Sequence, residues 1–442
     1  MATKKDLLEA QKFSRTRLLS AFLGGAPGGK ELAPANPLRA VYGSIALTAM
    51  VIIAGIFVGF FKPGLPSGWE NNRLIVAKDT GARYVSMDSV LYPVVNTVSA
   101  RLLIPPGEFS VVSVNQDVLS GVEIGDTIGI FGGPDTLPTP DRLDGANWLA
   151  CSSPEATELW LGGQRKAAAP ADSGAVVTHE GNSYVIADGK SFAVPDQQQA
   201  AVLRAAGLSG ATPTEVTGAW LSLFEPADPL APLELPGAGE RLEGVTFPIG
   251  TVIHPSGSGE EERYLLTADG ELSPLSPLAY RLYQLGDGSG SLGEAIDVSP
   301  AELADLPSGT DSGGAGWPAQ PLTTHPGDGA PCATLEGPRE AQRSVLAVDV
   351  GDTIRPEETE QPVLTHVPEG AGAIVQAGKG GTLTLIDPLG MSYAVPGDIG
   401  ESVARFGYDE SDVHVVPHQW LQLLPAGPEL TTEAAGSSPV EP

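Results

Sequence analysis

The sequence predicts an α+β protein with an N-terminal cytoplasmic helix, one transmembrane helix and an extracytoplasmic body of four small α+β repeats. Three observations predict this fold: an uncharged run of 22 residues at 40–61, an excess of Lys and Arg before that run, and four copies of one hairpin pattern after it. We expect the body to be pseudo-two-fold, with the repeats arranged around a mostly β central domain.

The head, residues 1–39, is predicted to be a cytoplasmic helix followed by a linker. Residues 3–23, TKKDLLEAQKFSRTRLLSAFL, are typical of a helix, which the following glycines and proline end. The stretch GGAPGGKE at 24–31 matches the G-x-x-x-x-G-K spacing of a phosphate loop. However, Glu31 stands where a Ser or Thr would hold Mg²⁺, and a helix precedes the stretch instead of a strand. We therefore interpret it as a helix cap and linker.

The uncharged run AVYGSIALTAMVIIAGIFVGFF at 40–61 is predicted to be a transmembrane helix. At about 1.5 Å per residue it spans roughly 33 Å, close to the hydrocarbon thickness of a bilayer. It is apolar on all faces, which disfavours a buried core helix, and no A-x-A site follows, which disfavours a cleaved signal peptide. Seven Lys and Arg against three acidic residues in the first 40 place the N-terminus in the cytoplasm. The protein is therefore expected to be single-pass in the cell membrane, with its bulk extracytoplasmic.

The charge and composition of the chain limit its partners and its fold. The net charge is −29, which argues against nucleic acid as a partner because nucleic acid needs a basic surface. The 55 Gly and 40 Pro residues predict modest helix content and many turns.

Four segments of the exported part share one pattern. Each alternates apolar residues on both sides of a tight turn, which is typical of a β-hairpin. Each continues with a helix-like stretch and a closing V-x-x-x-x-L element. The four hairpins are RYVSMDSVLYPV from 83, SYVIADGKSFAVP from 183, RYLLTADGELSPLS from 263 and TLTLIDPLGMSYAVP from 382.

Long segments separate the first two repeats and the last two. The order repeat, core half, repeat therefore occurs twice, which predicts the pseudo-two-fold body. The expected divisions are repeat 1 at 62–121, the first half of the central domain at 122–181, repeat 2 at 182–230, a linker and central-domain strand at 231–262, repeat 3 at 263–306, the second half of the central domain at 307–381, repeat 4 at 382–430 and a disordered tail at 431–442.

The only two cysteines, Cys151 and Cys332, fall one in each long segment. An oxidising exported compartment permits a disulfide between them, which would join the two halves of the central domain. Two free buried thiols are the alternative.

Histidines offer no metal site that the pattern supports. His414 and His418 have the i, i+4 spacing of a zinc site, but Pro417 lies between them and no H-E-x-x-H occurs. His179 and His366 occupy similar places at the ends of the two long segments, which fits duplication better than catalysis. We identify no catalytic, cofactor-binding or metal-binding residue.

Tryptophans could form sugar-binding platforms on a domain that faces the cell wall. Trp220 and Trp420, however, recur at one place in the second and fourth repeats, which favours core packing. Trp69, just outside the span, is typical of an interfacial anchor.

The head and span, the segment RYVSMDSVLYPVVNTVSARLL, the single cysteine pair and the ending WLQLLPAGPEL together carry a resemblance. The chain resembles EccB, the membrane component of the ESX or type VII secretion system of actinobacteria. The resemblance covers nearly the whole chain except the tail TTEAAGSSPVEP.

The resemblance implies a cytoplasmic N-terminus, one transmembrane helix, and four exported repeats around a core whose disulfide matches Cys151 and Cys332. It implies assembly with an FtsK-like ATPase, a multi-span channel component and a membrane-anchored protease, and export of WXG-type proteins. Some family members carry an ATPase label, but this sequence has no complete nucleotide motif. We therefore expect a structural subunit without a cofactor, with self-association possible; ATPase activity and cell-wall glycan binding are the alternatives.

Overall fold

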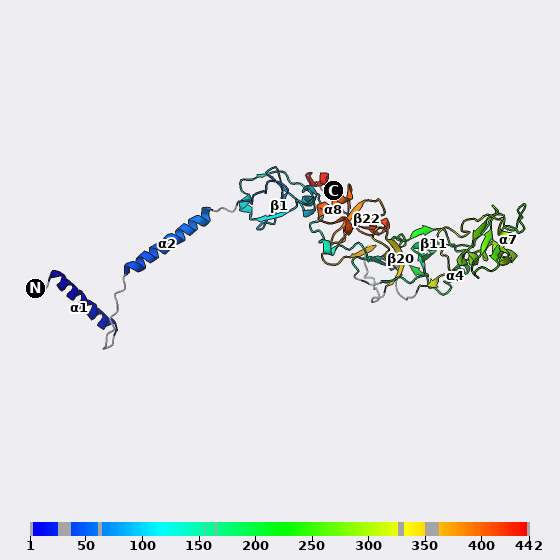
Figure 1. The fold of residues 1–442 in the computed structure, drawn as a ribbon, viewed down its shortest axis with the longest axis horizontal. Coiled ribbons are helices and arrows are strands. Elements are labelled where there is room, and N and C mark those ends of the chain that lie inside the picture. The colour runs from blue at the N-terminus through cyan, green and yellow to red at the C-terminus, as the bar shows by residue number, and fades with distance from the viewer. Residues whose placement is uncertain are drawn as a thin grey trace. The chain divides into compact units, whose positions relative to one another are not determined.

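Figure 1 shows the computed structural model of the protein. The structure describes residues 3–24, 37–60, 64–153, 155–163, 165, 167–325, 331–349 and 362–439. The chain divides into two compact units, Met1–Leu65 and Pro66–Pro442.

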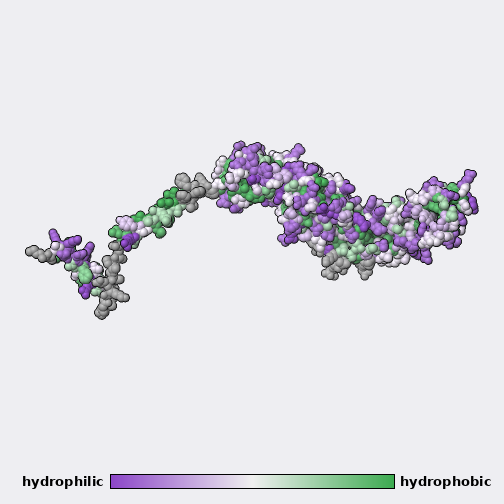
Figure 2. Space-filling view, viewed as in Figure 1, coloured by the Kyte–Doolittle hydropathy of each residue, from purple (hydrophilic) through white to green (hydrophobic). Residues whose placement is uncertain are grey.

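The first unit contains two helices, α1 (Lys4–Gly24) and α2 (Pro37–Phe60). At the start of α1 the Asp6 carboxylate accepts hydrogen bonds from the backbone and the hydroxyl of Thr3, at 2.9 and 2.6 Å. Among the described residues α2 is the one helix long and apolar enough to cross a membrane, and Figure 2 shows apolar surface along it. The phosphate-loop-like residues after Gly24 lie outside the described residues.

The second unit contains five small sheets in its described residues, and four of them share one topology. A first strand pairs with an antiparallel hairpin of second and third strands. A helix follows, and the fourth strand returns to pair in parallel with the first, giving the order 4-1-2-3. The exit segment of each repeat then pairs in parallel with the third strand. The topology is therefore that of one supersecondary unit used four times.

The four repeats contain equivalent elements, which run along the chain as follows. Repeat 1 contains β1 (Arg73–Ala77), β2 (Arg83–Met87), β3 (Val90–Pro93), α3 (Thr97–Leu103), β4 (Val111–Val114) and β5 (Glu123–Ile124). Repeat 2 contains β9 (Ser173–His179), β10 (Asn182–Ala187), β11 (Lys190–Val194), α4 (Gln199–Ala205), β12 (Thr214–Glu215), α5 (Gly218–Leu221) and β13 (Glu225–Ala227). Repeat 3 contains β14 (Val252–Pro255), β15 (Tyr264–Leu266), β16 (Leu272–Pro274), α6 (Pro277–Tyr283), β17 (Ile296–Val298) and α7 (Pro300–Leu303). Repeat 4 contains β22 (Ala373–Ala377), β23 (Leu383–Ile386), β24 (Ser392–Val395), α8 (Ile399–Phe406), β25 (His414–Val416) and α9 (His418–Leu421).

The four predicted hairpins are confirmed. In repeats 2, 3 and 4, however, the first strand of the sheet lies outside the segment predicted for that repeat. β9 lies within the expected central half 122–181, β14 within 231–262 and β22 within 307–381. Each of these strands pairs with the second strand of its own repeat. The predicted divisions at 181, 262 and 381 therefore fall inside or beside a sheet.

The fifth sheet contains three strands from each long segment, in the order β21-β7-β6-β19-β20-β8. β6 and β19 pair antiparallel at its centre. β8 pairs with β20 of the other segment, and β21 pairs with β7, so each segment contributes the outermost strand on the other's side. The strands are β6 (Leu149–Ser152), β7 (Thr157–Trp160), β8 (Ala167–Ala168), β19 (Pro331–Glu336), β20 (Arg343–Asp349) and β21 (Val363–His366), and a further short strand, β18 (Thr323–Thr324), pairs with β9.

The repeats pack in two pairs through their helices. α3 of repeat 1 contacts α8 of repeat 4, and α4 of repeat 2 contacts α6 of repeat 3. One buried cluster joins Val98 and Leu102 to the core of repeat 4, and another joins Leu278 and Leu282 to the core of repeat 2. Repeats 1 and 4, which are distant in sequence, therefore share a hydrophobic core, and so do the consecutive repeats 2 and 3.

The prediction of a disordered tail at 431–442 is wrong for the residues that the structure describes. A short helix, α10 (Thr432–Ala435), lies there, capped by the Thr431 hydroxyl, which accepts from the Ala434 amide at 3.0 Å. Leu430 and Ala435 are buried in the same cluster as Val98 of repeat 1. The polar composition suggested disorder, whereas buried apolar residues and a backbone hydrogen bond from the Gly129 amide to the Ser437 carbonyl, at 3.0 Å, hold the segment. Residues 440–442 lie outside the described residues.

Candidate functional site

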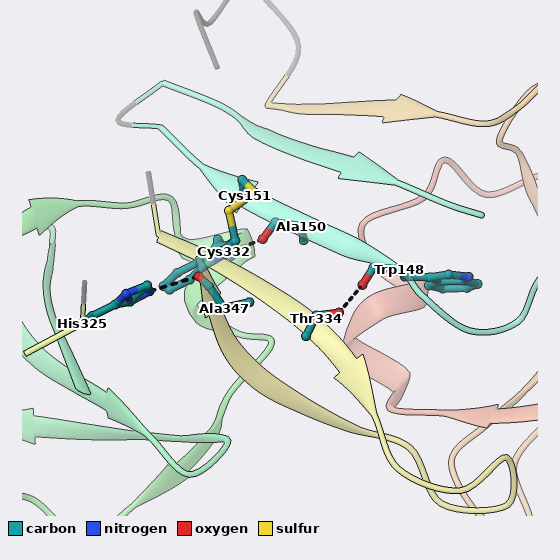
Figure 3. The surroundings of a disulfide bond; sticks show 8 residues. Trp148, Ala150, Cys151, His325, Cys332, Thr334 and Ala347 are labelled. Carbon is teal, nitrogen blue, oxygen red and sulfur yellow. Dashed lines mark hydrogen bonds between the residues drawn. A yellow bond between two sulfur atoms is a disulfide. The ribbon is translucent and has the colours of Figure 1, made fainter. Parts of the chain in front are cut away.

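The disulfide between Cys151 and Cys332 lies at the middle of the central sheet. The two residues are directly opposite in the antiparallel pair β6–β19, with Cα atoms 4.0 Å apart. Figure 3 shows the bond joining these adjacent strands, one from each long segment. The side chains are 1% and 0% exposed. The two sulfur atoms are bonded to each other, in place of the alternative of two free buried thiols.

Polar groups around the disulfide are paired with backbone carbonyls. The Thr334 hydroxyl donates to the Trp148 carbonyl at 3.1 Å, and His325 Nε2 lies 3.0 Å from the carbonyl of Ala347 (Figure 3). Ala347 is the neighbour of Cys332 on the other side. Burial lowers the pKa of His325, which favours a neutral ring whose one N–H serves this carbonyl. The surroundings are those of a packed core.

Trp220 lies in α5 of repeat 2 and Trp420 in α9 of repeat 4, and both rings pack against the central sheet. Both are 0% exposed and belong to the cluster that covers this sheet. The Trp220 Nε1–H donates to the Ala150 carbonyl of β6 at 3.0 Å, and that of Trp420 donates to the Ser344 hydroxyl of β20 at 2.8 Å. The predicted core packing is confirmed, and neither ring is available as a sugar platform.

The tips of the two central hairpins dock on the same two repeats. The Thr217 amide of repeat 2 donates to the Ser152 hydroxyl at 3.0 Å. In repeat 4 the Val415 amide donates to the Arg339 carbonyl at 2.7 Å, and the Gln342 amide donates to the Val415 carbonyl at 3.2 Å. Repeats 2 and 4 therefore contact the central sheet through both hydrophobic and backbone interactions.

Two arginines, which the sequence did not single out, join repeat 1 to repeat 4. Arg101 of α3 donates to the Phe406 carbonyl of α8 at 2.8 Å. Arg405 of α8 donates to the carbonyls of Leu102 and Ile104 at 2.6 and 3.3 Å. Each guanidinium thus satisfies carbonyls that the other helix leaves unpaired at its C-terminus. Burial lowers the pKa of Arg101, but an arginine remains charged at neutral pH.

The four histidines considered from the sequence lie in different settings. His179 ends β9 of repeat 2, whereas His366 ends β21 of the central sheet and stacks on Trp160 with ring centroids 5.1 Å apart. The expected equivalence of His179 and His366 is therefore wrong. His414 lies in β25 and His418 begins α9. Among the described residues no three His, Cys, Asp or Glu side chains gather as a metal-binding set.

Comparison with known proteins identifies the family. The family model described as type VII secretion system ESX-1, transport TM domain B, matches residues 1–438. The ESX-3 secretion system ATPase EccB3 of Mycolicibacterium smegmatis is 25% identical over 90% of this chain and 84% of its own length. The ESX-5 secretion system ATPase EccB5 of Mycobacterium tuberculosis is 26% identical over 89% of this chain and 85% of its own.

Solved structures share the fold. The EccB3 dimer from the ESX-3 core complex matches with a TM-score of 0.62 and 22% identity, over 82% of this chain and 99% of that one. A chain of an intact ESX-5 inner membrane complex matches with a TM-score of 0.60 and 22% identity, over 98% and 95%. With the family model matched along nearly the whole sequence, the chain belongs to the EccB family of ESX type VII secretion system components.

Proposed function

We propose that this protein is a structural, membrane-anchored subunit of a type VII secretion complex. Its partners would be an FtsK-like ATPase, a multi-span channel component, a membrane-anchored protease and further copies of itself, and the exported cargo would be WXG-type proteins. The observation that carries the proposal is the one membrane-length helix of the described residues, attached to a body whose buried centre makes structural contacts. Relatives solved as a dimer and within an ESX inner membrane complex support it.

We further propose that the body is pseudo-two-fold, with the disulfide near the axis. The docking of the two hairpin tips on repeats 2 and 4 supports this symmetry. Trp220 and Trp420 both pack on the central sheet, although they bond to β6 and β20, which the axis would not exchange. The helix pairs α3–α8 and α4–α6 would be exchanged by the same axis. A scaffold of this kind offers two similar surfaces of repeats, which suits assembly with several neighbours.

The charge of the head and the disulfide support the proposed orientation of the chain in the membrane. The basic head would lie in the cytoplasm by the positive-inside rule, and the disulfide needs the oxidising side of the membrane. Protease added outside spheroplasts should digest only the second unit and leave the head intact. Digestion of the head by protease added outside would contradict this orientation and indicate the opposite one.

The test of the scaffold is extraction from the native membrane in mild detergent, with the mass and composition of the particle measured. We expect a large assembly that contains an FtsK-like ATPase and a multi-span partner. A variant lacking residues 1–40, given a heterologous membrane helix to keep its exported location, should lose assembly. The near-ultraviolet circular dichroism of that variant, which reports the packing of aromatic side chains in the body, should match that of the intact chain; this separates lost assembly from misfolding. A stable monomer from the native membrane would contradict the proposal.

ATP hydrolysis by the chain itself is the second candidate function, because two relatives are named as ATPases. Purified full chain should then hydrolyse ATP, and a Lys30→Ala variant should report whether the stretch 24–31 contributes. Equal background activity in wild type, variant and buffer would remove this candidate. Glycan binding is tested in parallel by sedimentation of the chain with purified peptidoglycan.

A further inference from the structure

His254 of repeat 3 makes a set of polar contacts on the surface of that repeat. It lies in β14, directly opposite Asp297 in the parallel neighbour β17. His254 Nδ1 is 2.7 Å from the Asp297 carboxylate, and the His254 side chain is 20% exposed. A carboxylate only accepts hydrogen bonds, so Nδ1 carries a proton in either charge state of the ring.

The other ring nitrogen has two possible partners. His254 Nε2 lies 3.0 Å from the carbonyl of Gly259 and 3.3 Å from the hydroxyl of Ser258, both in the connection between β14 and β15. A carbonyl can only accept, so its bond requires a proton on Nε2 and hence a charged imidazolium. A hydroxyl can donate, so Ser258 suits the neutral ring. The geometry thus provides one partner for each charge state.

The charged groups around the ring favour the imidazolium. His254, Glu260, Arg263, Ala295 and Asp297 line one open hollow on repeat 3. The bonds to the Asp297 carboxylate and then to the Gly259 carbonyl raise the pKa of His254 above its usual value of 6.5, while partial burial and the Arg263 charge act in the opposite direction. The pKa of His254 is therefore raised on balance, and the ring stays charged to a higher pH than a free imidazole does.

We propose that His254 is a proton-operated latch on the 256–263 connection. The charged ring holds the Gly259 carbonyl; the neutral ring releases it and accepts from the Ser258 hydroxyl instead. Because the folded-state pKa is raised, the latch is complete at a pH below the usual imidazole value and is lost as pH rises through the raised value. Ser258, His254 and Asp297 resemble a nucleophile–base–acid set, and while the latch is closed the ring, protonated on Nε2, cannot take a proton from the hydroxyl.

The connection that the latch holds or releases is acidic. The connection carries three consecutive carboxylates, Glu260–Glu262. It is also tied by the Ser256 amide, which donates to the Val298 carbonyl at 2.9 Å, and by Gln320, which donates to Glu261 at 3.2 Å. These ties keep the connection near β17 when the latch opens, so the change is local loosening. The state of His254 thereby sets how firmly this acidic segment is presented to a partner.

The test is hydrogen–deuterium exchange of the peptide covering 255–263, measured on the full chain in detergent between about pH 5 and about pH 8. After correction for the intrinsic exchange rate, wild type should lose protection with a midpoint above 6.5. His254→Gln should remove the pH dependence, and Asp297→Asn should move the midpoint to lower pH, because the carboxylate is the main group favouring the charge. Ser258→Ala should enlarge the loss on the alkaline side.

His418→Gln is the matched control, since His418 lies in repeat 4 and contacts Gln422 at 3.1 Å. It should leave the exchange profile of 255–263 unchanged. Protection that is independent of pH in wild type, or an Asp297→Asn midpoint equal to that of wild type, would overturn the latch. Asp297→Asn keeps the shape of the side chain, so it tests the proposal even where His254→Gln is poorly folded.

Discussion

Removal of the disulfide by Cys151→Ala together with Cys332→Ala should destabilise the body without changing its fold. The two residues are 181 positions apart, and the chain-entropy model gives about 5 kcal/mol for closing a loop of that length, as an upper bound. The strands β6 and β19 remain paired through Ala150 with Ala333 and Leu149 with Thr334. We therefore expect the same native structure with a lower free energy of unfolding.

The assay is thermal unfolding of the full chain in detergent, followed by near-ultraviolet circular dichroism, with and without dithiothreitol. Because the side chains of Cys151 and Cys332 are 1% and 0% exposed, the reductant should reach the bond only as the sheet opens. Wild type with reductant and the double variant should show similar lowered midpoints. The double variant is its own control, since reductant should not shift it further.

Two results would refute the reasoning. One is an unfolding midpoint for the double variant equal to that of oxidised wild type. The other is labelling of two thiols per chain in denatured, unreduced wild type, which would mean that Cys151 and Cys332 are not bridged. Labelling near zero, with two labels after reduction, is the expected outcome.

Three further predictions concern the contacts between modules. Trp220→Ala and Trp420→Ala should each destabilise the body by about 3–5 kcal/mol, because both rings are fully buried and hydrogen-bonded to the central sheet. The thermal unfolding midpoints of the two variants test this. A negligible effect at either site would mean that its ring does not hold the repeat onto the central sheet. Arg405→Met should lower the free energy of unfolding by about 2 kcal/mol and speed amide exchange in 97–103, because the carbonyls at the end of α3 lose a charged donor. Unchanged exchange in 97–103 would count against the capping of α3 by Arg405. Truncation after residue 428 should likewise raise exchange in 97–103 while leaving repeat 3 unaffected, and equal protection would mean that the tail is dispensable.

The hairpins could be predicted from the sequence because their turns have a local chemical signal. Asp188 and Gly189, and likewise Asp88 and Ser89, have the positive φ angles of tight hairpin turns, at 50°, 76°, 51° and 66°. The first strand of each repeat carries no such signal, and only its pairing with the hairpin reveals that it belongs there. The divisions between repeats and core were therefore the least predictable part of the fold.

Some contacts of the candidate site could be predicted from the sequence and others could not. The cysteine pair could be anticipated from the compartment and the resemblance, and the recurring tryptophans from the repeat. The capping of α3 and α8 by Arg101 and Arg405 could not, because the donor and acceptor residues lie about three hundred positions apart in the chain. The tail was expected to be disordered because a composition average hides buried residues such as Leu430 and Ala435.

The exchange of outer strands in the central sheet makes the two halves of the body mutually dependent. β8 completes the sheet beside β20, and β21 completes it beside β7, as in a domain-swapped dimer whose subunits have been fused into one chain. A product that ends after repeat 2 would leave β6 and β7 with open edges, which are templates for aggregation. The body should therefore unfold as one cooperative unit, and its four repeats cannot be lost or gained singly as in a solenoid.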